Sequence, residues 1–238
     1  MTRSLIVLLS LLLSGCASTH GFDRATMQSL LHPDNETVTE QTASSQTDKP
    51  ARPLPLRMAI YFVQRSFPLH HQIQRAEWVT ADKDLLAKWL MPLQGEQILT
   101  ETFHLVDTTI QGHDVEKIRR AAARYDADVV LIVDGLASVD RYNNGYAAWY
   151  ATLIGAYVAP GTVSDALVMI RSSLWDARTE RLYVTQTVEG RSTLTGSALL
   201  LEDGPVLAQA KTAALVELGK RTVDEWRRSR TLPARDRS

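Results

Sequence analysis

The chain of 238 residues is 45% hydrophobic and 22% charged, with a formal net charge of −1. This balance is typical of folded globular proteins and excludes an intrinsically disordered chain. The near-zero net charge gives no electrostatic reason to expect nucleic-acid binding.

The first fifteen residues have the pattern of a secretory signal peptide. Arg3 supplies the positive start, residues 5–13 form an apolar run, and the small residues Ser14 and Gly15 precede Cys16. Such signals contain an apolar core of roughly 7–15 residues, whereas a bilayer span needs about 20. We therefore expect residues 1–15 to be removed.

Cys16 is the only cysteine of the chain, so no internal disulfide is expected. The stretch 13–16 resembles the bacterial lipobox, whose cysteine is acylated and becomes the N-terminus; an ordinary secreted protein with a chance cysteine is the alternative. Multiple acyl chains would hold the protein firmly on a membrane. The residue after the cysteine is Ala17 and not Asp. By resemblance to the sorting rule of lipoproteins in enteric bacteria, this favours the outer membrane over the inner membrane.

Residues 16–53 are rich in Thr, Ser, Gln, Asp and Pro. Such a segment buries too little apolar area to offset its ordering entropy, which predicts a flexible tether. The apolar stub 27–33, ended by Pro33, is the exception and could dock on the domain as a turn of helix.

The domain is expected over residues 54–230. In chain order the patterns predict a buried strand over 54–63, a helix over 82–91 stopped by Pro92, a strand over 103–110, a helix over 114–125 with Asp114 as N-cap, and a strand over 127–135. Alternating strands and helices favour an α/β layer with some parallel pairing.

The second half predicts a β-hairpin, with strands over 165–176 and 181–189. A long amphipathic helix over 205–230 follows, before a disordered tail at 231–238. Its expected packing side comprises Val206, Ala210, Ala213, Ala214, Leu218, Val223 and Trp226. Together these elements predict an α/β (α+β) fold: a three-layer-like mixed sheet with flanking helices, a β-hairpin and a long C-terminal helix.

The segment 142–161 lies between two predicted strands, carries no charge and is rich in Tyr and Trp. Connections this long are uncommon in compact domains unless they have a function. One interpretation is a short helix or strand extension folded onto the sheet. The other is a surface for a partner, for self-association or for the membrane interface, with Tyr146, Trp149, Tyr150 and Tyr157 as candidate contacts.

Candidate chemistry is sparse. His70 and His71 are adjacent and cannot share a helix face as zinc ligands do, and residues 190–196 lack the Gly-Lys-Ser/Thr ending of a phosphate loop. The carboxylates Asp107, Asp128, Asp134 and Asp140 fall at predicted strand edges without a paired base or metal partner. We expect no catalytic residues, no metal and no cofactor.

Several stretches resemble the rhombotail lipoproteins, a family of uncharacterised bacterial lipoproteins. These are residues 29–33, 56–63, 125–130 and, most specifically, 149–161. More distantly, the order of elements is similar to the periplasmic α/β domain of curli-secretion and peptidoglycan-synthase-activator lipoproteins.

These observations predict an outer-membrane lipoprotein that faces the periplasm and is anchored in the membrane by acyl chains such as palmitate. We expect it to act as a non-enzymatic accessory or protein-binding factor of the cell envelope. The alternative is a homo-oligomeric ring or secretion channel that assembles through 142–161. A hydrolase is the third and least favoured hypothesis.

Overall fold

The computed structural model describes residues 19–31, 53–64, 72–106, 110, 114–152 and 154–231. The signal peptide, Cys16, His70, His71, Asp107 and the tail 232–238 lie outside these residues. The elements in chain order are α2 (Arg24–Leu31), β1 (Leu56–Phe62), β2 (Ile73–Arg75), α4 (Thr80–Gly95), β3 (Leu99–His104), α5 (Val115–Arg124), β4 (Val129–Asn143), η3 (Gly145–Ala151), α6 (Gly155–Val158), β5 (Thr162–Asp176), β6 (Leu182–Gly196) and α7 (Asp203–Thr231). None of the described helices is long and apolar enough to cross a membrane.

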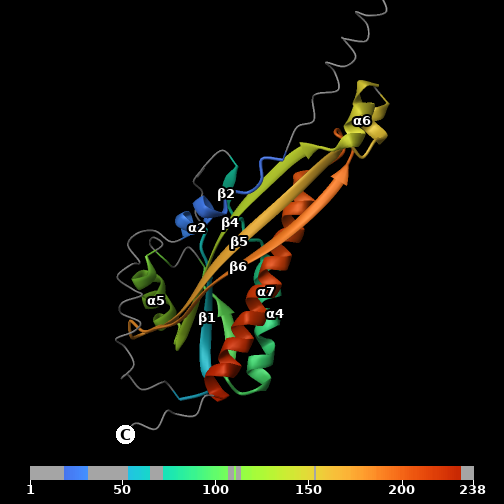
Figure 1. The fold of residues 1–238 in the computed structure, drawn as a ribbon. Coiled ribbons are helices and arrows are strands. Elements are labelled where there is room, and N and C mark those ends of the chain that lie inside the picture. Colours follow the sequence, from blue (N-terminus) through green and yellow to red (C-terminus); the bar gives the residue numbers. More distant parts are fainter. Residues whose placement is uncertain are drawn as a thin grey trace, which may run out of the picture.

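A mixed six-stranded sheet forms the centre of the fold, with strand order β3-β1-β4-β5-β6 and with β2 paired to β4 beside β1 (Figure 1). β1 runs parallel to both β3 and β4, whereas β4, β5 and β6 form a long antiparallel meander. The parallel pairing, the hairpin and the long closing helix are confirmed. Each meander strand has 15 residues, so these three strands extend well beyond β1 at one end.

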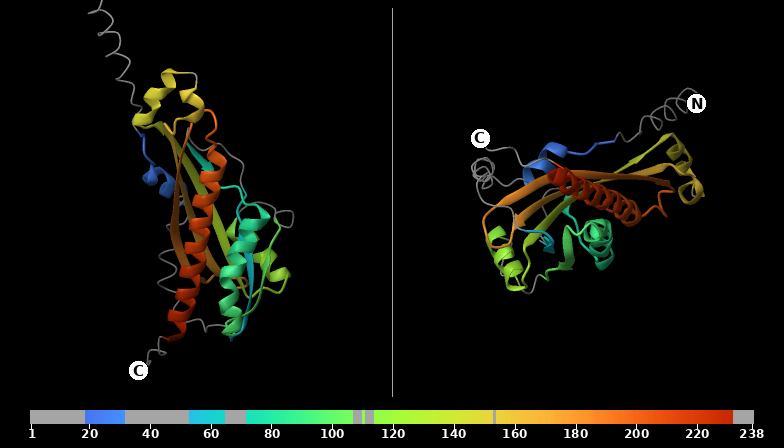
Figure 2. Two further views of the ribbon diagram at one scale, coloured as in Figure 1. Left: turned by 90° about the vertical axis from the view of Figure 1, so that its right-hand side faces the viewer. Right: turned by 90° about the horizontal axis from the view of Figure 1, so that it is seen from below.

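Helices cover both faces of the sheet, which gives three layers (Figure 2). Alternate residues of β1 and β4, such as Ile60 and Leu131, face α4 and α7 in the largest apolar core. The intervening residues, such as Tyr61 and Val130, face α5. The predicted α/β fold class is therefore confirmed.

Four local predictions are corrected. Pro92 lies inside α4 rather than stopping it, because the helix continues far enough to bury Leu93 completely. β3 begins at Leu99, earlier than expected, since its polar residues belong to an edge strand that pairs with β1. β4 runs to Asn143 instead of ending at Gly135. Ala213 is exposed, unlike the other small residues predicted on the packing side of α7.

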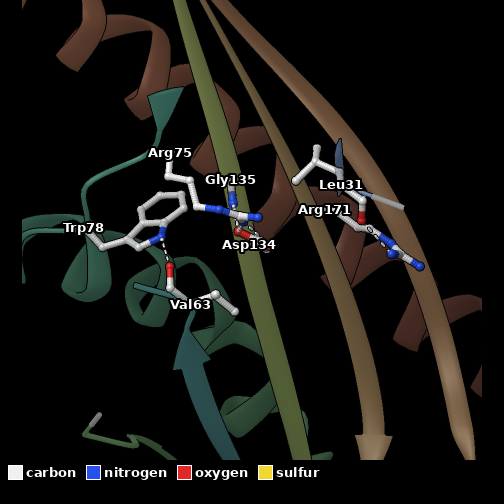
Figure 3. A network of polar contacts seen from close by, with 7 residues as sticks. All are labelled: Leu31, Val63, Arg75, Trp78, Asp134, Gly135 and Arg171. Carbon is white, nitrogen blue, oxygen red and sulfur yellow. Dashed lines mark hydrogen bonds and ion pairs between the residues drawn. The ribbon is translucent and has the colours of Figure 1, made fainter. Parts of the chain in front are cut away.

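The stub before Pro33 packs against the sheet as helix α2. Met27 is fully buried and Leu31 is 2% exposed, in a cluster with Leu136 of β4 and with Leu167 of β5. The guanidinium of Arg171 donates to the Leu31 carbonyl oxygen at 2.8 Å (Figure 3). The tether predicted over 16–53 thus contains a segment that belongs to the folded domain, as the docking alternative expects.

Candidate functional site

The carboxylates considered for chemistry hold structural contacts. Asp128 accepts the Arg57 backbone N–H at 2.9 Å. Asp134 lies within β4 and binds the Arg75 guanidinium through both oxygens at 2.7 Å (Figure 3). Residues 190–196 belong to strand β6 and form no phosphate loop. Within the described part of the chain, no group of three or more His, Cys, Asp or Glu side chains could hold a metal ion.

The uncharged segment forms a small cap at the end of the meander, beyond the end of β4 and the start of β5 (Figures 1 and 2). We call residues 144–152 and 154–161 the tip. Asn144 joins its two ends: its side-chain amide donates to the Pro160 carbonyl at 2.9 Å, and its amide oxygen accepts from the Tyr146 N–H at 2.9 Å. The backbone N–H of Asn144 also donates to the Gly161 carbonyl at 2.8 Å.

Close backbone contacts make the tip compact. A Cβ atom at Gly155 would lie 1.8 Å from the Trp149 carbonyl oxygen, and one at Gly161 would lie 2.6 Å from the Ala147 nitrogen. Tyr150 is partly buried, and its hydroxyl lies 2.9 Å from the Thr162 hydroxyl at the start of β5. Of the four candidate contact residues, Tyr150 therefore supports the cap from within.

The other three candidate residues are on the outside of the tip. Tyr146 is 61% exposed, Trp149 64% and Tyr157 53%. Ile154 and Val158 are exposed beside them, at 75% and 70%. The short-helix interpretation is right about local structure, yet these side chains project to solvent and do not fold onto the sheet.

The turn between β6 and α7, residues 197–201, lies next to the tip and adds to its apolar surface. Leu199 and Leu200 are 59% and 69% exposed. Twelve large apolar side chains are exposed among the described residues, and seven of them belong to the tip and this turn. A concentration of exposed apolar side chains at one end of a fold makes that end a candidate interaction site.

Two of the charged residues at the base of the tip, Arg141 and Asp203, lie close to one another, whereas Glu202, directly after the turn, is exposed. Arg141 donates to the Ala198 carbonyl at 2.9 Å and lies 3.8 Å from the Asp203 carboxylate, which accepts from the Ser164 hydroxyl at 2.7 Å. Next to Arg141 along β4, the Tyr142 hydroxyl donates to Asp165 at 3.1 Å. Desolvation, together with this hydrogen bond, raises the pKa of Tyr142 and keeps its hydroxyl protonated.

Asp140 holds the beginning of the described chain three residues below the end of β4. Its side chain is almost fully buried, and one carboxylate oxygen accepts from the Thr19 hydroxyl at 2.7 Å and from the Gly21 N–H at 2.9 Å. His20 lies 3.9 Å from the other oxygen. We call Asp140, Thr19 and Gly21 the Asp140 clamp.

Sequence reasoning missed the clamp and the turn 197–201, which carries two of the seven exposed apolar side chains. Thr19 and Asp140 are separated by 121 positions, and no pattern connects a lone threonine to a distant carboxylate. The three consecutive leucines at 199–201, between a predicted strand and a predicted helix, are a signal that could have identified the flanking turn.

No family model matches the chain, and no curated protein matches it. Among solved structures, the chain is similar to a Xanthomonas campestris protein of family DUF330 at 13% identity and a TM-score of 0.33, over 77% of this chain and 93% of that one. A Helicobacter pylori protein described as a neuraminyllactose-binding hemagglutinin homologue has 8% identity and a TM-score of 0.39, over 78% and 96%. A hypothetical Chlamydia trachomatis protein has 10% identity and a TM-score of 0.28, over 73% and 94%. At these values the likeness assigns neither a family nor a function to this chain.

Proposed function

We propose that this protein is a lipid-anchored component of the bacterial cell envelope that acts through binding rather than catalysis. Cys16 carries the acyl chains, and the α/β domain stands on the periplasmic face of the outer membrane as an accessory factor for a partner protein. The resemblance to the rhombotail lipoproteins, a family of uncharacterised bacterial lipoproteins, supports the lipid anchor.

The observation that carries the proposal is the short path from Cys16 to the folded domain. Thr19, three residues after the cysteine, already donates to Asp140. Three residues of extended chain span at most about 11 Å. An acylated Cys16 therefore holds the domain close to the membrane, which suits a protein that works at that surface.

The non-enzymatic role rests on the polar groups of the sheet. Asp128 accepts a backbone N–H of β1, and Asp134 forms an ion pair with Arg75. Asp140 accepts hydrogen bonds from the N-terminal segment. Each carboxylate is thus explained by a structural contact. Seven of the twelve exposed large apolar side chains of the described residues belong to the tip and the turn 197–201, two stretches without charge, which is typical of contact surfaces.

Replacing Cys16 with Ser is expected to abolish lipidation and to leave the precursor with its signal peptide. The physical reason is that the hydroxyl cannot replace the thiol as the acyl acceptor. Cells grown with labelled palmitate and expressing the full chain provide the measurement. Label on Cys16→Ser equal to that on the wild type would contradict the proposal.

Ala17→Asp is the matched control for this experiment, because it alters the neighbouring residue and keeps the cysteine. It is expected to incorporate palmitate like the wild type. In an enteric host, it should also move from the outer-membrane to the inner-membrane fraction. Unchanged fractionation would contradict the outer-membrane part of the proposal.

A further inference from the structure

We propose that the tip, together with the turn 197–201, lies in the lipid interface of the membrane that holds Cys16. The inference rests on the proposed lipid anchor and extends it: the anchor and the tip form one membrane-contacting end of the protein. The exposed aromatic side chains thus contact the bilayer surface.

The clamp limits where the lipid can be attached relative to the sheet. The Asp140 clamp fixes Thr19 beside β4, and Cys16 lies within about 11 Å of Thr19 along the chain. Asp140 is only three residues from the end of β4, which is about 10 Å along a strand. The acyl chains therefore attach near the end of the sheet that carries the tip.

The N-terminal segment runs toward the tip. Helix α2 packs against Leu136, whereas Thr19 binds Asp140, so the chain runs along β4 toward the tip when followed back toward Cys16. Figure 1 shows this stretch, in blue, rising from α2 alongside β4. The opposite end of β4, at Val129, is eleven residues from Asp140, or roughly 36 Å.

The exposed side chains of the tip have the chemistry of a membrane-interface surface. Tyr and Trp are the residues enriched at membrane–water interfaces, where an apolar ring and a polar group are both satisfied. Trp149 and Tyr157 are exposed beside Ile154 and Val158, and neither 142–161 nor 196–201 contains a charged residue. The first charged residues on either side are Arg141, before the tip, and Glu202 and Asp203, after the turn. They lie at the base of the tip, at the depth of the polar headgroups if the tip enters the lipid interface.

A second copy of the chain and a protein partner are the other candidate occupants of this apolar surface. The clamp favours the bilayer, because it places the membrane anchor beside the tip and keeps the anchor there. A partner on the tip would have to share this space with the bilayer surface.

Contact quenching by brominated lipids tests the inference. Trp149 is the only one of the five tryptophans that is exposed. The full-length lipidated protein is reconstituted into vesicles of phosphatidylcholine with or without bromine on the acyl chains, and the mass of its N-terminal peptide establishes acylation. We expect the Trp149 emission to be shifted to shorter wavelength and to be largely lost in brominated vesicles.

Two variants assign the signal. Trp149→Phe keeps an apolar ring and should remove the bromine-dependent loss of emission, whereas Trp89→Phe, at the half-buried contact of α4 with α7, should leave this loss unchanged.

Trp149→Ala should keep a thermal midpoint near wild type, because the indole makes little buried contact. A large drop in its midpoint would show that Trp149 is core and would overturn the inference.

The remaining outcomes separate the two proposals. Acylated protein whose emission is equal in both kinds of vesicle would overturn the inference and leave the lipid anchor intact. Tip-dependent oligomers without bromine quenching would do the same and would assign the surface to self-association. Protein without acyl chains would contradict the proposed function, and the inference would fall with it.

Discussion

Met27→Ala is expected to lower the free energy of unfolding by about 2–5 kcal/mol, the usual range for truncating a buried Met, Leu or Ile to Ala. Met27 is fully buried between α2 and the sheet, in contact with the cluster that contains Leu136 and Leu167. The substitution keeps helix propensity high, so the loss measures packing. Urea denaturation of a version of the chain beginning at Ala17 gives the value.

Ser29→Ala is the matched control on the same helix. Ser29 is exposed and bonds only to the Thr26 carbonyl one turn earlier, so its loss should change stability by less than about 0.5 kcal/mol. Equal stability of Met27→Ala and the wild type would show that α2 does not pack on the sheet in solution. A version that begins at Leu54 would then fold as well as the longer chain, as the tether prediction expects.

Gly190→Ala is expected to destabilise the domain by about 1–3 kcal/mol or more through overpacking. A Cβ atom at Gly190 would lie 2.1 Å from the Ala210 carbonyl oxygen and 2.4 Å from the Ala214 nitrogen, both in the backbone of α7. Backbone atoms of a 29-residue helix cannot move aside without lifting the helix from β6. Thermal and urea denaturation both measure the effect.

Gly196→Ala, in the same strand, serves as the comparison. The nearest atoms to its added Cβ belong to the flexible side chain of Leu201, with the closest at 3.2 Å, so a small shift accommodates the methyl group. Its effect should be well under that of Gly190→Ala. Equal losses at both positions would indicate a general cost of alanine in β6 rather than close contact with α7.

The fold was predictable where local pattern and tertiary environment agree. The apolar run of β1, the N-cap Asp114, whose carboxylate accepts the Glu116 N–H, and the spacing of α7 each specify their element directly. β3 was harder to place, because an edge strand with exposed Thr100 and Glu101 lacks the apolar pattern of a central strand.

The location of the candidate site in the sequence was predictable, whereas the exposure of its side chains and the clamp were not. Composition singled out 142–161, but exposure depends on where the cap sits relative to the sheet, and only the tertiary structure determines that. Tyr146 and Tyr150 are chemically identical, yet one faces solvent and the other supports the cap through Thr162. The clamp depends on a contact between residues 121 positions apart, which no local pattern encodes.

The most direct test of the account is the depth of single spin labels in the membrane. In the lipidated protein the thiol of Cys16 is acylated, so a cysteine at position 146 or 228 is the only reactive one. Tyr146 is on the tip, whereas Arg228 is on α7, 25 residues after Asp203 and about 37 Å from it along the helix. Both side chains are exposed.

In vesicles, the account predicts that a label on Tyr146→Cys is more accessible to oxygen than to a water-soluble nickel complex. A label on Arg228→Cys should show the opposite preference. Aqueous accessibility at both positions, in protein whose acylation has been verified, would contradict the claim that this end of the domain contacts the membrane.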